Sequence, residues 1–183
     1  MAFARVYSIQ PGFPTSEKVA VETDLARGLY SFSVVGLPGK AVEEARDRMS
    51  AAIKHSGFES PKSKNRKVVI SLAPADLKKE GTVFDLPMAL SYLLAAEELS
   101  FDPEDIVFLG ELGLDGTLRA VKGTLPAALA ARMGGFRSLI VPRENAAEAA
   151  LVADLAVFGA GSLREVIEHV RGRKKIEQTP HQP

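Results

Sequence analysis

The first part of the chain alternates between apolar and polar side chains in two short runs. The runs cover residues 19–23 and 30–34, and Gly28 lies between them at a turn. An alternation with period two predicts half-buried strands and is typical of an antiparallel pair. We therefore expect the chain to open with a small antiparallel arrangement.

After these strands, the apolar residues recur at the spacing of a helix. Apolar residues at 42, 45, 49 and 53 form one stripe, which predicts a helix over residues 41–55 that stops at Gly57. A second helix is predicted over residues 86–98. It is apolar on several sides, which indicates a central helix, and Pro87 falls in its first turn, where a missing amide costs little.

The rest of the chain alternates between buried strands and helices. Strands are predicted at 68–72, 106–109, 139–141 and 155–158, and helices at 125–132, 145–151 and after Ser162. Asp115-Gly116 predicts a hairpin with a type I′ turn. Thr124 is the expected N-cap of the helix that ends at Gly134, and Ser162 and Glu165 have capping-box spacing. This order predicts an α+β fold, an α/β sandwich with a mixed sheet and packed helices.

Length and composition indicate one domain of ordinary globular character. The 183 residues include 23 basic and 23 acidic side chains, so any basic site must be local. We expect a domain over residues 1–170, and a basic and polar linker tail over 171–183 because its composition changes there. The absence of cysteine excludes disulfides, thiolate metal sites and cysteine nucleophiles.

Targeting signals and metal motifs are absent from the sequence. The N-terminus has no basic region followed by an apolar stretch, and no apolar run approaches transmembrane length, so we expect a cytoplasmic protein without membrane contact. His55, His169 and His181 lack metal-ligand spacing, and we expect surface or tail positions and no metal site.

Two short motifs resemble catalytic signatures without their chemistry. Residues 36–40 look like the end of a phosphate-binding loop, but Val34 replaces the first glycine and Ala41 the hydroxyl that holds magnesium. Residues 114–118 look like a haloacid-dehalogenase signature, but Gly113 stands where the nucleophilic aspartate belongs. We interpret both as turns.

A set of longer motifs is more specific in combination. They are Ser33-Val34-Val35-Gly36-Leu37-Pro38, residues 41–48, Ser56-Gly57-Phe58, residues 71–77, residues 78–81, Phe84-Asp85-Leu86-Pro87, residues 110–116 and residues 141–149. In this order they resemble the N-terminal region of the magnesium-chelatase-like competence family, the ComM family. That resemblance implies a fold similar to the Lon peptidase domain and the C-terminal domain of the RadA recombination factor.

The resemblance also implies a larger protein. Family members continue into an AAA+ ATPase module, and some look like ring-shaped helicases that drive DNA branch migration during recombination of transforming DNA. This chain stops about where that module would begin, so we expect no cofactor here, with ATP and Mg belonging to the missing module. The implied partners are further copies of the chain in a ring and single-stranded or branched DNA.

The same resemblance bears on peptidase activity. Lon-like peptidases use a serine nucleophile and a lysine base kept neutral by desolvation. The serine's place falls near Asp85 and the lysine's place near Leu125, so both catalytic positions are lost and we expect no enzyme activity of the fragment. We expect Asp85 to cap the central helix. Thr82 and Lys122 are the nearby substitutes for a dyad.

The loss of both catalytic positions favours binding as the function class, in subunit assembly, DNA guiding or both. The candidate DNA contacts are basic side chains that would meet phosphates: Lys62, Lys64, Arg66, Lys67, Lys78, Lys79, Arg119 and Lys122. The alternative for each cluster is a solvated loop. A residual Lon-like serine hydrolase and a magnesium-chelatase-type ATPase subunit stay open as alternative functions.

Overall fold

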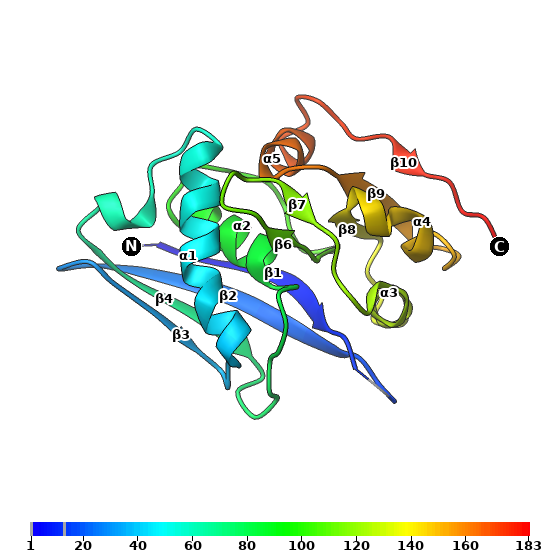
Figure 1. The fold of residues 1–183 in the computed structure, drawn as a ribbon, viewed down its shortest axis with the longest axis horizontal. Coiled ribbons are helices and arrows are strands. Elements are labelled where there is room, and N and C mark those ends of the chain that lie inside the picture. The colour runs from blue at the N-terminus through cyan, green and yellow to red at the C-terminus, as the bar shows by residue number, and fades with distance from the viewer. Residues whose placement is uncertain (1, 13) are drawn as a thin grey trace.

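The computed structural model describes residues 2–12 and 14–183 as an eight-stranded sheet with helices packed on it (Figure 1). The strands of this sheet are β1 (Ala2–Gln10), β2 (Glu17–Arg27), β3 (Ser31–Val35), β4 (Arg66–Ala73), β5 (Ile106–Phe108), β8 (Ser138–Pro142), β9 (Ala156–Ala160) and β10 (Gln178–Thr179). The helices are α1 (Lys40–His55), α2 (Asp85–Ala95), α3 (Thr124–Met133), α4 (Ala146–Ala149) and α5 (Leu163–Val170), with 3-10 turns at Pro61–Ser63 and Arg143–Asn145. The order β10-β9-β8-β5-β1-β2-β4-β3 mixes parallel and antiparallel neighbours and confirms the predicted fold class.

The N-terminal half of the sheet is mostly antiparallel. β1 pairs with β2, and β2 pairs with β4, both antiparallel. The expected pairing of β2 with β3 is wrong, because β4 lies between them and β3 pairs with β4 in parallel. Parallel neighbours need a crossover connection, and α1 provides it between β3 and β4. β1 was not predicted at all.

The C-terminal half of the sheet is parallel except at its edge strand, β10. β5 lies beside β1 and β8, and β8 lies beside β9, each pair in parallel register. Along the chain, α3 precedes β8 and α4 precedes β9. β5 and β8 are buried at every position after their first, which accounts for their continuous apolar sequences, whereas β9 is half-buried at three of its five positions.

Helix α2 is the centre of the hydrophobic core, as predicted. All residues from Asp85 to Leu93 are buried, and α2 contacts β1, β2 and α1. The Thr23 hydroxyl of β2 hydrogen-bonds the Ser91 hydroxyl of α2 at 2.7 Å, so a polar pair is satisfied within this layer. α2 therefore joins the sheet to α1 and fixes the loops at its ends.

The small hairpin of β6 (Glu111–Leu112) and β7 (Leu118–Arg119) occurs at the predicted place. Its turn is not type I′. Gly116 has a φ of 91°, but Asp115 is not among the described residues with positive φ, which a type I′ turn requires at both positions. The Asp115 carboxylate instead accepts hydrogen bonds from the Thr117 amide (3.0 Å) and hydroxyl (2.7 Å).

Helix ends follow the sequence signals only in part. Ser162 caps α5 by accepting a hydrogen bond from the Glu165 amide at 3.1 Å, as predicted. Gly134 ends α3 as predicted, but Thr124 is its first residue and not its cap. The cap is Gly123, whose left-handed conformation (φ 81°) starts the helix one residue earlier than expected.

The segment 171–183, in which we expected no folded element, is attached to the sheet edge. β10 pairs antiparallel with β9. The Ile176 amide donates to His169 Nδ1 at 2.9 Å, and His181 Nδ1 lies 2.7 Å from the Ala150 carbonyl oxygen. His169 is half-buried against Phe158 (ring centroids 4.6 Å apart), and not at the surface. The edge of β9 supplies the backbone hydrogen-bond partners for β10, and the composition of the segment could not indicate this pairing.

The helices of residues 2–12 and 14–183 all fall short of the length and apolar character that a membrane crossing requires. Over the same residues, no group of three or more His, Asp or Glu side chains could hold a metal ion.

Candidate functional site

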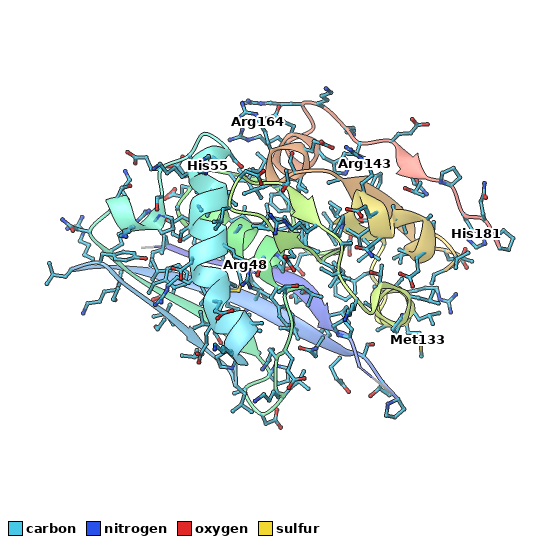
Figure 2. All side chains as sticks on the ribbon, in the orientation of Figure 1. Arg48, His55, Met133, Arg143, Arg164 and His181 are labelled. Atoms are coloured by element: carbon cyan, nitrogen blue, oxygen red, sulfur yellow. The ribbon has the colours of Figure 1, made fainter. Side chains whose placement is uncertain are left out.

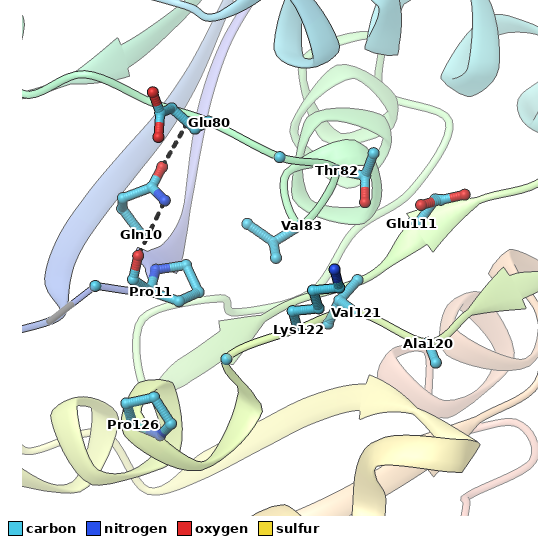
Figure 3. A pocket seen from close by; sticks show the side chains of 13 residues that line it. Gln10, Pro11, Glu80, Thr82, Val83, Glu111, Ala120, Val121, Lys122 and Pro126 are labelled. Atoms are coloured by element: carbon cyan, nitrogen blue, oxygen red, sulfur yellow. Dashed lines mark hydrogen bonds between the residues drawn. The ribbon is translucent and has the colours of Figure 1, made fainter.

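A pocket of about 600 Å³ opens where the ends of several elements meet (Figure 3). Its walls come from the end of β1, the loop before α2, strand β6 and the segment between β7 and α3. The lining residues are Gln10, Pro11, Gly12, Glu80, Gly81, Thr82, Val83, Glu111, Ala120, Val121, Lys122, Gly123 and Pro126. Loops at the ends of a rigid sheet are common positions for binding sites, because the scaffold holds them in place.

The pocket wall is held by a glutamine clamp. The Gln10 side-chain amide accepts a hydrogen bond from the Glu80 backbone amide at 2.8 Å and donates to the Pro11 carbonyl at 3.1 Å (Figure 3). The clamp joins the β1 end to the loop before α2. No local pattern in the sequence indicates this role of Gln10, because its partner Glu80 is 70 residues away.

The polar side chains of the pocket are Thr82, Glu111 and Lys122 in addition to the clamp (Figure 3). The structure thus brings the two substitute dyad residues, Thr82 and Lys122, to one pocket. The Lys122 side chain is exposed, whereas a lysine that serves as a base needs a dry environment to be neutral. Within the described residues, no hydrogen bond joins the two side chains.

Asp85, the residue at the serine's place, lies outside the pocket and is fully buried. Its carboxylate accepts hydrogen bonds from Arg48 Nε (2.7 Å), Arg48 Nη2 (2.9 Å) and the Leu112 amide (3.0 Å). The expected role as a helix cap is wrong. The cap of α2 is Phe84, and Asp85 is the first helical residue, so its side chain turns to α1 and β6.

Burial and hydrogen bonding shift the pKa of Asp85 in opposite directions. Desolvation raises the pKa of Asp85 to about 6, against the hydrogen bonds from Arg48 and Leu112, which lower it. The hydrogen bonds that Arg48 donates to Asp85 in turn raise the pKa of Arg48, which also donates to the Ala41 carbonyl at 2.7 Å. The pair therefore fixes α1 against α2 and β6, and it leaves the carboxylate no free position to attack a substrate.

Leu125, at the lysine's place, is half-buried on α3 and does not line the pocket. Neither of the two positions equated with the Lon catalytic pair thus supplies a reactive side chain to the pocket. Val83 lies on its wall instead, between Thr82 and the start of α2.

Lys79 cannot contact phosphate in this structure, because its side chain is fully buried. Its ammonium donates to the Gly36 carbonyl at 2.7 Å and to the Pro74 carbonyl. Desolvation lowers the pKa of Lys79. The lysine is a structural donor that fastens the β3–α1 loop to the β4–α2 loop, where the Gly39 amide also donates to the Lys79 carbonyl at 2.7 Å.

The remaining basic candidates do not form one surface. Arg66 begins β4 and Lys78 follows its other end, and the eight residues of β4 separate these ends by roughly 23 Å. Arg66 donates to the Tyr92 hydroxyl at 2.6 Å, and Lys64 forms a salt bridge with Glu59. The exposed candidates that make no salt bridge among the described residues are Lys62, Lys67, Lys78, Arg119 and Lys122.

Similarity to known proteins shows the family to which the chain belongs. A family model described as subunit ChlI of Mg-chelatase matches residues 21–145, and the chain belongs to this magnesium-chelatase-like family. The competence protein ComM of Haemophilus influenzae is 39 % identical over 177 residues, which cover 96 % of this chain and 34 % of that protein. The protein YifB of Salmonella typhimurium is 41 % identical over 161 residues, 87 % of this chain and 31 % of that protein.

A weaker similarity reaches the Lon proteases. The Lon protease of Rhizobium meliloti is 24 % identical over 180 residues, covering 86 % of this chain and 22 % of that protein. This agrees with the Lon-like fold that the motifs implied. The chain spans about a third of the length of the ComM and YifB relatives, so their complete activities extend beyond what these residues encode.

Proposed function

We propose that this chain is a non-catalytic N-terminal domain of an AAA+ ATPase, and that it serves subunit assembly, DNA guiding or both. The observation that carries the proposal is the position of Asp85. The residue in the nucleophile's place is fully buried, accepts three hydrogen bonds and lies outside the pocket. A side chain held in this way links α1, α2 and β6 and is unavailable for acyl transfer.

The proposal for the whole protein follows from its relatives. The whole protein would be an AAA+ machine that handles DNA, with branch migration as the specific activity that the motif resemblance implies; the similarity to the competence protein ComM supports this proposal. In that assembly the domain would lie in a ring of identical subunits. ATP and Mg would bind in the ATPase module, and this domain would contribute packing surface or phosphate contacts.

The test is a titration of the chain into fluorescently labelled single-stranded and forked DNA, followed by anisotropy at low and moderate salt. DNA guiding predicts an affinity that falls as salt rises, since lysine and arginine release counterions from phosphates. A lack of binding at low salt would contradict DNA guiding and leave subunit packing as the function.

A residual hydrolase is the second candidate, and one observation favours it. Thr82 and Lys122 line the same pocket. Incubation with an unstructured protein substrate tests it, with Lys122→Ala as the control variant. Cleavage that disappears in Lys122→Ala would support a Thr-Lys dyad, and equal results for both proteins would exclude it. A magnesium-chelatase-type subunit role depends on the ATPase module and is tested there.

A further inference from the structure

The basic segment after α5 lines a groove together with α5 itself. Two hollows, of about 550 and 210 Å³, adjoin there and share Arg164 and Glu168. Their charged residues are Arg143, Arg164, Arg171, Arg173, Lys174 and Lys175, against Glu165, Glu168 and Glu177. We refer to these two hollows as the α5 groove. Figure 2 shows Arg143 and Arg164 near α5, on the upper side of the molecule.

Two of the arginines are held in place by neutral groups. Arg164 donates to the Ser56 carbonyl at 2.8 Å, and Arg171 donates to the Glu98 carbonyl at 2.9 Å. A carbonyl orients a guanidinium without neutralising its charge. Arg164 is therefore pre-organised, makes no salt bridge among the described residues and keeps further N–H donors for an anion, which is the arrangement that favours phosphate recognition by arginine. Arg171 is oriented in the same way but shares part of its charge with Glu168.

The acidic residues of the groove are partly engaged. Glu165 accepts hydrogen bonds from Arg143 Nη2 at 2.9 and 3.1 Å and from the Gly161 amide at 3.2 Å. The Glu168 carboxylate lies 3.7 Å from Arg171 Nη1. The six basic residues consequently exceed the three acidic ones, and the excess is on the segment after α5.

The segment after α5 is attached to the fold, whereas its composition predicted a linker tail. The amides of Arg173 and Lys174 donate to the Glu168 carbonyl at 3.0 and 3.2 Å, and β10 continues the segment on the sheet. The side chains of Arg173, Lys174 and Lys175 are exposed and make no salt bridge among the described residues. Three unpaired cations thus lie beside the two oriented arginines.

We propose that the α5 groove binds the phosphodiester backbone of nucleic acid. The inference rests on the DNA-guiding role proposed above and assigns it a surface that differs from the scattered lysines around β4. Arg164 and Arg171 are seven residues apart, which separates them by about 10 Å along α5. Charged donors on an exposed surface fit the phosphates of the backbone, whose contacts carry no sequence information.

Two matched triple variants of the 183-residue chain test the inference. The groove variant carries Arg173→Gln, Lys174→Gln and Lys175→Gln. The control variant carries Lys62→Gln, Lys67→Gln and Lys78→Gln. All six side chains are exposed, so both variants lose three positive charges without losing core packing. Circular dichroism verifies folding, and the single change Arg173→Gln replaces the groove triple if that variant does not fold.

Labelled single-stranded DNA is titrated with each protein over a range of salt concentrations. We expect the groove variant to bind roughly tenfold more weakly than the wild type, with a salt slope reduced by about 2, and the control variant to bind within a factor of about two. Competition with inorganic phosphate distinguishes the sources of the phosphate group. DNA displaced by millimolar phosphate alone would overturn the inference in favour of a free-phosphate site.

The other outcomes separate the two proposals. If the wild type binds and only the control variant is weakened, the groove assignment is wrong while DNA guiding stands. Equal weakening of both variants would indicate a diffuse charge effect and also overturn the groove. If the wild type itself does not bind, DNA guiding fails, and the groove assignment fails with it.

Discussion

The buried Arg48–Asp85 pair makes a sharp prediction about stability. Arg48→Met removes the charge and two of the three donors to Asp85 but keeps most of the side-chain volume. The pKa of Asp85 is raised from 3.8 to about 6 even with Arg48 present, so burial of the carboxylate already outweighs its bonds by about 3 kcal/mol. Removing Arg48 leaves an uncompensated buried charge, which typically costs 3–5 kcal/mol.

Urea unfolding at pH 8 measures this loss. We expect Arg48→Met to lower the free energy of unfolding by about 3 kcal/mol, the lower end of that range. The loss is limited because the Arg48 side chain is 19 % exposed and because the unpaired Asp85 can take up a proton. Adding Asp85→Asn to Arg48→Met should restore about 2 kcal/mol, since the unpaired charge is then gone.

The pH dependence supplies a second readout on the same pair. A carboxyl group whose folded pKa is raised contributes stability below its unfolded pKa, and this contribution is lost as pH rises through about 6. The defect of Arg48→Met should therefore shrink between pH 8 and pH 5. A loss below about 1 kcal/mol, or no recovery on adding Asp85→Asn, would refute the account of Asp85 as a buried, ionised structural partner.

Three other predictions concern fold stability. Lys79→Met leaves the Gly36 and Pro74 carbonyls without the donor that the buried ammonium supplies and should cost about 1–2 kcal/mol in urea unfolding, whereas Lys78→Met at the exposed neighbouring position should change stability by less than about 0.5 kcal/mol. Gly36→Ala should destabilise by about 1–3 kcal/mol, because φ is +106° and the added Cβ would lie 2.2 Å from the Leu72 carbonyl oxygen; unchanged stability would contradict this geometry. Burial and Lys175 lower the pKa of His169, whose neutral Nδ1 accepts from Ile176, so the attachment of β10 is present above the ordinary histidine pKa and is lost as pH falls through the lowered value. The protection of the Ile176 amide against exchange, relative to its intrinsic rate at each pH, should therefore fall at acid pH in the wild type, and should show no histidine titration in His169→Phe.

Local patterns predicted most helices and strands, because their signals lie within a few residues. The stripe of α1 and the cap of α5 are of this kind. The pairing of β3 with β4 is not, since it depends on the crossover through α1. β1 was missed although it lies at the middle of the sheet, between β2 and β5.

The site residues show the same limit more strongly. Lys79 is indistinguishable from Lys78 in the sequence, yet one is fully buried and the other exposed. Asp85 has the position of a helix cap, but its partner Arg48 is 37 residues away and redirects the carboxylate. Burial and long-range partners decide these roles, and a single sequence records neither.

DNA guiding by this domain is tested by the anisotropy titration of the wild-type chain with single-stranded DNA at low salt. A DNA-guiding domain should bind with an affinity that weakens as salt rises, with a linear dependence of the logarithm of affinity on the logarithm of salt concentration. Absence of binding at low salt, with the protein folded, would contradict a DNA-guiding domain and assign DNA contact to the ATPase module.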